Sequence, residues 1–467
     1  MNTAYWKNID IEYGKNVLKV KVPPYCDILK VDYPPPLKEP EKDIENALSN
    51  PIGTLPIEKI VASCKKPSSE VTVAIAVSDN TRPVPYHAES KEGILLPILG
   101  RLQKAKVKRE NITIIVATGT HVPTSKEWKK ETFGEYITER YCIIDHDCIS
   151  KDLVFLGDVE GVSVKVNKKF MEADVRIITG LVEPHFMAGV SGGRKTICPG
   201  LVNLETTYVF HGAEFIDDPN ATNLVLRKNP CHEFSLKVAR KARVDFSVNV
   251  TIDGEGRLTD VFAGDMEKAH FKAFEKVRKY TLIPCKDEYD IVLTHGGKVA
   301  VNHYQAAKAA YGATPIVKKG GMVILVAHNG DEEPVGKEEY KKVLKILKDK
   351  GPGKFTELIK DKNWKFVPDQ WQVQKWDQFF RKIGCFDNLI YCTTNISSKD
   401  LKDLPGKSGY DFVEKSDKPD PEKMVQNAIF YVLTVAKKRL GKEPKMAFIR
   451  EGPYAVPTLE DKNLTAR

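Results

Sequence analysis

Three apolar runs, each followed by a cluster of polar residues, constrain the fold of this chain more than any other feature. They are VTVAIAV at 71–77, ITIIVA at 112–117 and the apolar stretch at 175–182. Continuous apolar runs of this length are typical of strands covered on both faces. Helical patterns lie between them, for example at 93–102, and this alternation predicts a mostly parallel sheet with helices on both faces.

The second half of the chain repeats this pattern. Apolar strands are expected at 289–294, 321–327 and 388–393, and a helix is expected at 301–311. Polar or glycine-rich residues again follow each of the first two strands. The second half therefore predicts an α/β unit of its own.

A chain of 467 residues is long enough for two or three domains. We expect an α/β fold of two domains, residues 1–283 and 284–467, with mostly parallel sheets flanked by helices and an active-site cleft between them. Residues 245–261 predict a hairpin near the end of the first domain. The last helix, 421–440, carries an apolar stripe and is a segment that can pack back on the first domain.

The composition indicates an ordinary globular protein. Hydrophobic residues make up 42% of the chain and charged residues 29%, and no apolar run is long enough to span a membrane. The first residues lack the pattern of a signal peptide, and the nine cysteines include no CxxC pair, so we expect reduced thiols and a cytoplasmic location. The net charge of +9 comes from lysines spread over helices, which favours a solvated surface over nucleic-acid binding and also fits a field that attracts anionic substrates.

Polar side chains follow the three apolar runs of the first domain. Asp79 and Arg82 follow the first run, His121 the second and His185 the third. Because ligands collect at the carboxyl ends of parallel strands, one cleft can hold all four. Arg82 presents a planar fork that matches a carboxylate or a phosphate, and the alternative is a structural ion pair with Asp79. The histidines can act as general acids or bases near neutral pH, although a lone histidine is more often structural.

A glycine-rich loop, AGVSGGRKT, follows His185. It does not match the phosphate-binding pattern GxxxxGK[ST], because Arg194 separates Gly193 from Lys195, and no GxGxxG follows a strand. The backbone amides of Ser191, Gly192 and Gly193, together with Arg194, are nevertheless expected to form an anion cradle suited to a monophosphate. The alternative is a tight turn without a ligand.

Lys195 and His211 carry the remaining reactive groups of this stretch. Lys195 is a candidate for covalent attachment or for a phosphate contact, and His211 for a metal ligand. No HExxH, EF-hand loop or cysteine pair supplies a familiar metal site. A metal bound through one protein histidine must take most of its ligands from elsewhere, which points to an organometallic cofactor.

Taken together, several motifs resemble the lactate racemase family, whose enzymes use a nickel-pincer nucleotide. They are SDNTRP, ATGTH, EPHFMAGVSGGRKTICPG, FHGAEF, YQAAK and DQWQ, in this order, between about residues 10 and 450. The block from EPH to SGGRK is the most specific of them.

The resemblance implies a cofactor and a role for each motif residue. The cofactor would be the pyridinium-3,5-bisthiocarboxylic acid mononucleotide of nickel, attached covalently at Lys195, with His211 as the nickel ligand. His121 and His185 would be the acid/base pair, and Arg82 would hold the substrate carboxylate. The residues implied to line the substrate are Asp79, Tyr304, Gln305, Lys308 and Trp371. Tyr304, Gln305 and Lys308 lie three or four residues apart in a predicted helix and share one face.

The implied activity is racemisation or epimerisation of a lactate-like 2-hydroxy acid. It would proceed by proton-coupled hydride transfer to the cofactor through a 2-oxo acid intermediate, and the cofactor-biosynthesis enzymes would be partners. Two alternatives use the same residues. One is a protein that stores or delivers a cofactor or phosphate compound without turnover, and the other is a metal-independent sugar-acid lyase or dehydratase.

Overall fold

The computed structural model describes residues 4–416 and 418–460, which form two compact units. The first unit comprises Tyr33–Phe215 and Asn220–Tyr280, and the second comprises the chain up to Asp32, Ile216–Pro219 and the chain from Thr281. The change of unit at Thr281 lies close to the expected boundary. The structure differs from the expected division at the N-terminus, because the chain up to Asp32 packs with the second unit.

The first unit is built on a six-stranded sheet with the order β13-β12-β9-β4-β5-β6. Its strands are β13 (Leu258–Gly264), β12 (Phe246–Ile252), β9 (Val175–Leu181), β4 (Val73–Val77), β5 (Ile112–Val116) and β6 (Cys142–Asp145). All neighbours are parallel except β12 and β13, which form the expected hairpin. Every residue of β4 is buried, as the apolar run predicts. The expected mostly parallel α/β fold is confirmed.

Helices cover this sheet, and two short hairpins extend from it. The helices are α1 (Pro40–Ser49), α2 (Ile57–Ala62), α3 (Leu95–Lys104), α4 (Lys126–Phe133), α5 (Glu135–Arg140), α6 (Lys168–Glu172), α7 (Leu204–Phe210), α9 (Pro230–Ala242) and α10 (Met266–Thr281). The hairpins are β7 (Val154–Val159) with β8 (Val162–Val166), and β10 (Pro184–His185) with β11 (Gly189–Val190). Apolar residues of α3, such as Leu99, pack with Ile75 of β4 and Ile114 of β5 in one core.

The second unit has a six-stranded sheet in which all neighbours are parallel, with the order β18-β17-β16-β15-β19-β3. Its strands are β18 (Lys407–Ser408), β17 (Leu389–Cys392), β16 (Val317–Val326), β15 (Tyr289–His295), β19 (Met446–Ile449) and β3 (Asp27–Leu29). β3 explains why the N-terminal segment belongs here, because it pairs with β19 near the other end of the chain. A further parallel pair joins β14 (Leu282–Cys285) to β20 (Val456–Leu459).

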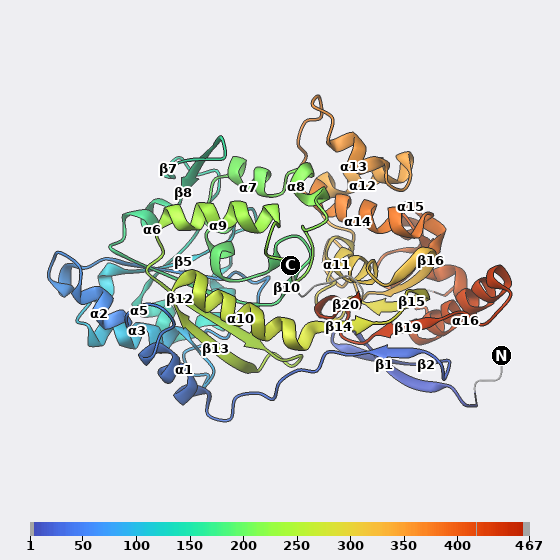
Figure 1. Ribbon diagram of the computed structural model, residues 1–467, viewed down its shortest axis with the longest axis horizontal. Coiled ribbons are helices and arrows are strands. Elements are labelled where there is room, and N and C mark those ends of the chain that lie inside the picture. Colours follow the sequence, from blue (N-terminus) through green and yellow to red (C-terminus); the bar gives the residue numbers. More distant parts are fainter. Residues whose placement is uncertain (1–3, 417, 461–467) are drawn as a thin grey trace. The chain divides into compact units, whose positions relative to one another are not determined.

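The helices of the second unit include the predicted last helix. They are α11 (His303–Ala313), α12 (Glu338–Lys350), α13 (Lys354–Ile359), α14 (Gln370–Ile383), α15 (Ser398–Asp403) and α16 (Pro421–Leu440), and α8 (Ala213–Asp217) ends in this unit. Figure 1 shows α16, in red, beside the blue hairpin of β1 (Lys7–Tyr13) and β2 (Asn16–Val22). The amide of Lys19 donates to Glu422, and Ile429 packs with Ile324 of the sheet. The last helix therefore packs within the second unit. Among the described residues, every helix is too short or too polar to cross a membrane.

Replacing Ile75 with alanine should destabilise the first unit, because Ile75 is fully buried in the central strand. The cavity left behind should lower the free energy of unfolding by about 2–5 kcal/mol. Ile149→Ala is the matched control, since Ile149 is 72% exposed; there the change should be about 0.5 kcal/mol or less. Denaturant titrations of both variants test this, and equal losses would contradict the assignment of β4 to the core.

Candidate active site

The strands that carry the candidate residues are neighbours in one sheet. β4 lies between β9 and β5, and all three run parallel, so their carboxyl ends meet at one edge. Asp79 and Arg82 follow β4, and His121 follows β5. His185 follows β9 in the short strand β10. Asp79 contacts His121, and Arg82 contacts Glu183 just past β9, so the structure brings residues from all three strand ends together.

Asp79 and His121 form a hydrogen-bonded pair. Oδ2 of Asp79 lies 2.5 Å from Nδ1 of His121, and Oδ1 accepts bonds from the amide and hydroxyl of Thr81. Burial alone would raise the pKa of Asp79, but the bonds from His121 and Thr81 and the charge of Arg82 outweigh it and lower that pKa. An ionised Asp79 fixes the His121 proton on Nδ1 and leaves Nε2 as a proton acceptor. The His121 side chain is 51% exposed.

Arg82 is paired with Glu183, a residue that the sequence analysis did not single out. Its Nε lies 3.1 Å from Oε1 of Glu183, and its NH1 group donates to the carbonyl of Thr81 at 2.7 Å. The structural alternative considered from sequence was an ion pair with Asp79, and the carboxylate that binds the guanidinium is instead Glu183. Glu183 could have been found from the sequence by its position two residues after β9, at the same edge of the sheet as Arg82.

His185 is oriented by backbone amides. Its Nδ1 accepts the N–H groups of Met187 at 3.3 Å and Ala188 at 3.2 Å. These donors favour the neutral tautomer that carries its proton on Nε2. Nδ1 is thus hydrogen-bonded in both histidines. In His185 it accepts from two amides, whereas in His121 it faces the carboxylate of Asp79.

The loop after His185 is a bonded turn, which differs from the expected anion cradle. The amide of Ser191 donates to the carbonyl of Glu183, and the amide of Gly193 donates to the side chain of Asn249. Gly192 and Gly193 have φ of +71° and +52°, a region that favours glycine. The 3₁₀ turn Gly193–Thr196 follows. Two of the three amides proposed for a phosphate are therefore already bonded within the protein.

Arg194 also differs from its expected role. It is 1% exposed, and its NH2 group donates to the carbonyls of Ala188 at 2.6 Å and Val190 at 2.9 Å. NH1 lies 3.1 Å from Nε2 of His270 and 3.4 Å from the carbonyl of Gly192. The guanidinium donates to backbone carbonyls of its own loop and so stabilises the loop's conformation. The sequence had instead predicted that it would bind an anion.

Lys195 and His211 influence each other electrostatically. Burial, followed by the positive charges of Arg82 and Arg194, lowers the pKa of half-buried Lys195 to about 7. The Lys195 ammonium lies 5.0 Å from the ring centre of Phe210. Burial and the charge of Lys195 lower the pKa of His211 to about 3, so that its ring is neutral.

The orientation of the His211 ring is fixed by its own helix. Its Nδ1 lies 3.0 Å from the carbonyl of Thr207 and donates to it, so Nε2 is the unprotonated nitrogen of the neutral ring. Among the described residues, no group of three or more His, Cys, Asp or Glu side chains is arranged to hold a metal ion.

The remaining predicted residues belong to the second unit. Tyr304 and Trp371 contact each other, because the indole N–H of Trp371 donates to the Tyr304 hydroxyl at 3.0 Å. Burial raises the pKa of Tyr304, so it is protonated at neutral pH. The Gln305 side-chain oxygen is buried without a hydrogen-bond partner in the described structure. Tyr304, Gln305 and Lys308 lie on α11, and Trp371 is the second residue of α14.

Gly193→Ala tests the tight turn. A Cβ at this position would lie 2.6 Å from the His270 ring, and the backbone already has a positive φ. The substitution should lower the free energy of unfolding by about 2–4 kcal/mol, the sum of a left-handed conformation and a clash. Gly161→Ala is the control, because its φ is +80° but nothing lies within 4 Å of the new Cβ; its loss should be about 1–2 kcal/mol. Equal losses would mean that the loop does not pack on His270.

Comparison with known proteins gives two family matches. Residues 13–223 match the lactate racemase N-terminal domain, and residues 285–452 match the lactate racemase C-terminal domain. The lactate racemase of Thermoanaerobacterium thermosaccharolyticum is 34% identical over 406 residues, covering 85% of this chain and 90% of that protein. The lactate racemase of Lactiplantibacillus plantarum is 33% identical over 357 residues, covering 75% and 79%.

Solved structures agree with these matches. The structure of the lactate racemase apoprotein from T. thermosaccharolyticum superposes with a TM-score of 0.81 at 28% identity, covering 97% of this chain and 100% of that one. A protein from Thermotoga maritima shares the fold with a TM-score of 0.60 at 18% identity. The resemblance inferred from the motifs is thereby confirmed: this chain belongs to the lactate racemase family, a family of isomerases.

Proposed function

We propose that this protein racemises lactate, or epimerises a closely related 2-hydroxy acid, with a nickel-pincer nucleotide as its cofactor. One observation carries the proposal furthest. The Asp79–His121 pair and the Arg82 guanidinium lie at one edge of the sheet, in a chain that belongs to the lactate racemase family. A proton acceptor beside a carboxylate-binding group is what a 2-hydroxy acid requires.

His211 has the chemistry of a nickel ligand. A metal-binding histidine must be neutral, and its second nitrogen is normally held by a hydrogen bond. The lowered pKa of His211 meets the first condition, and the bond to the carbonyl of Thr207 meets the second. Imidazole also suits nickel. Nε2 of His211 is therefore the atom that we assign to the metal.

Lys195 has the chemistry of an attachment point. Its pKa of about 7 leaves a large fraction of the amine neutral and nucleophilic at physiological pH, which an ordinary surface lysine lacks. The same residue could contact a phosphate while still charged. We favour covalent attachment, because burial and the neighbouring Arg82 and Arg194 charges all oppose the ammonium form.

Arg82 would hold the substrate carboxylate. Its Nε is paired with Glu183 and its NH1 group donates to the carbonyl of Thr81, and these two contacts fix the plane of the guanidinium. The NH2 group takes part in neither contact. A fixed plane matters here, because the carboxylate must stay bound while the carbonyl of the 2-oxo acid presents its other face. Glu183 is thus a positioning residue in this proposal.

The two histidines would move the hydroxyl proton. Asp79 stabilises the imidazolium that forms when Nε2 of His121 accepts a proton. In His185 the two backbone donors leave Nε2 as the nitrogen that can exchange a proton with substrate. One histidine would serve each enantiomer. Tyr304, Gln305, Lys308 and Trp371 are proposed to contact cofactor or substrate.

The α-hydrogen explains why a cofactor is needed. It is a poor acid beside a carboxylate, so its removal as a proton near pH 7 is difficult. When bound, the nickel-pincer nucleotide would supply hydride-acceptor chemistry for this hydrogen. The protein residues then need only bind the carboxylate and move the hydroxyl proton.

Removing either proposed catalytic histidine should slow turnover strongly without removing nickel. In nickel-loaded protein, His121→Ala and His185→Ala should each slow interconversion of D- and L-lactate by about 10²–10⁴-fold. His87→Ala is the control, because the described bond of His87 is to the amide of Glu89. Chiral chromatography measures turnover, and elemental analysis measures nickel.

Loss of nickel from either variant would make that histidine a metal ligand, and unchanged turnover would exclude it from proton transfer. If the nickel-loaded native protein turned over no 2-hydroxy acid, a storage or delivery role would replace the proposal.

The attachment and the metal ligand can be separated by mass. Protein produced with the cofactor-biosynthesis enzymes should be heavier than protein produced without them, and the increment should map to Lys195 after proteolysis. Lys195→Ala should lose both the increment and nickel, whereas His211→Ala should keep the organic increment and lose nickel. An increment elsewhere, or none in protein that retains nickel, would contradict attachment at Lys195.

A further inference from the structure

A cavity of about 340 Å³ lies in the first unit, on the side of the loop held by Arg194. Its walls come mainly from α9 and α10. Leu226, Leu236 and Phe271 supply apolar surface, and Phe271 is 49% exposed at the surface of the protein. The volume falls within the range of small-molecule sites. The polar part of the lining consists of Arg194, His232, Glu267, Lys268 and His270.

Among the described residues, Arg194 is a buried cation without an acidic partner. Its bonds are to three backbone carbonyls and to His270, and its Nε has no hydrogen-bond partner in the described structure. Glu267 also lines the cavity, but both of its oxygens bind Arg240, at 2.7 and 2.6 Å. Burial lowers the pKa of Arg194 to about 9, which reflects the cost of an unbalanced charge in this place. An anion in the cavity would balance it.

The two histidines add polar atoms without adding charge. Burial, followed by the charge of Arg194, lowers the pKa of His232 to about 2 and that of His270 to about 3. Nε2 of His270 lies 2.9 Å from the carbonyl of Ser191. Nδ1 of His232 is buried and has no partner among the described residues. Two side chains that line the cavity, Arg194 and His232, thus each carry a buried nitrogen that lacks a partner among the described residues.

We propose that this cavity binds a small organic monocarboxylate with an apolar substituent. The carboxylate would accept hydrogen bonds from Nε of Arg194 and from His232, and the substituent would pack on Leu226, Leu236 and Phe271. Charge-assisted bonds to a guanidinium are among the stronger hydrogen bonds available to a carboxylate. The site is distinct from the Arg82 clamp and does not depend on the proposed catalytic function.

Occupancy would act on the loop that carries Lys195. Arg194 directly precedes Lys195, and its NH2 group binds the carbonyls of Ala188 and Val190. A ligand that balances the Arg194 charge would stabilise the guanidinium in this position and with it the backbone between His185 and Lys195. The expected consequence is a less mobile loop.

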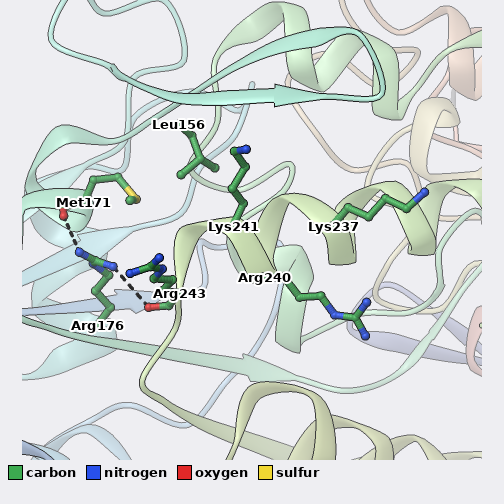
Figure 2. Close-up of a pocket in the computed structure, with 7 residues that line it drawn as sticks. All are labelled: Leu156, Met171, Arg176, Lys237, Arg240, Lys241 and Arg243. Carbon is green, nitrogen blue, oxygen red and sulfur yellow. Dashed lines mark hydrogen bonds between the residues drawn. The ribbon is translucent and has the colours of Figure 1, made fainter.

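A basic hollow elsewhere in the first unit is the rival site for an anion (Figure 2). Its volume is about 750 Å³, and its cations are Arg176, Lys237, Arg240, Lys241 and Arg243. Three of them are engaged: Lys237 pairs with Glu160, Arg240 pairs with Glu267, and the Arg176 guanidinium donates to backbone carbonyls. Lys241 and Arg243 are left to attract an anion, which makes this hollow a necessary control.

Calorimetric titration of the full chain with phenylacetate tests the proposal, with phenylacetamide as the uncharged analogue. Protein produced without cofactor suffices, so the outcome is independent of turnover. Phenylacetate should bind roughly tenfold or more tightly than the amide, because only the acid carries charge.

Leu236→Trp should fill the cavity and abolish binding, and His232→Phe should weaken it. The double variant Lys241→Ala/Arg243→Ala and the clamp variant Arg82→Ala should bind normally. Circular dichroism confirms that each variant is folded.

Hydrogen exchange provides a second measurement. Phenylacetate should slow amide exchange in residues 186–195 of the native protein and of the double variant, but not of Leu236→Trp. Equal binding of acid and amide would overturn the proposal, as would binding retained in folded Leu236→Trp. Binding lost in the Lys241/Arg243 variant would assign the anion to the basic hollow, and binding lost in Arg82→Ala would assign it to the substrate clamp.

Discussion

Parallel pairing of β9, β4 and β5 is the constraint on which the candidate site depends. The pairing of β4 runs from Val73 to Val77 with β5 and from Val73 to Ala76 with β9, so the backbone leaves all three strands at the same edge. Asp79, after β4, then meets His121, after β5, and Arg82, also after β4, meets Glu183, after β9. None of these four residues needs a long connection to reach its partner. The apolar interior of the sheet therefore sets the geometry of polar groups that lie outside it.

The loop after His185 depends on a different interaction, the burial of Arg194. A guanidinium bound to carbonyls at positions 188, 190 and 192 forces the backbone to fold around it. That close approach explains the glycines, since a side chain at Gly193 would meet His270. The same turn leaves Lys195 at a half-buried place near two arginines, where its pKa falls to about 7. Burial, Arg82 and this structural cation thus together lower the pKa of the amine that follows Arg194 in the sequence.

The sequence predicted those parts of the molecule that depend on local pattern. Apolar runs located the strands, and the rule for parallel sheets brought Asp79 and His121 to one edge, where the structure places them in contact. The loop could not be predicted in this way, because the amide of Gly193 binds Asn249 and Arg194 binds His270, and both partners lie far away in the chain. The three-residue strand β3 was also missed, since its only clear signal is a partner more than 400 positions later. The cleft between the domains and the roles of the site residues stay predictions.

The two histidines differ in what holds Nδ1, a carboxylate for His121 and two amides for His185. Enantiomers in water have equal free energies, so a racemase must have the same kcat/KM in both directions whatever its side chains are. If the two proton carriers are unequal, kcat and KM can differ between the two directions, but both must differ by the same factor. In such an enzyme, the asymmetry of the site would determine which enantiomer saturates it first, while the final mixture stays at one to one.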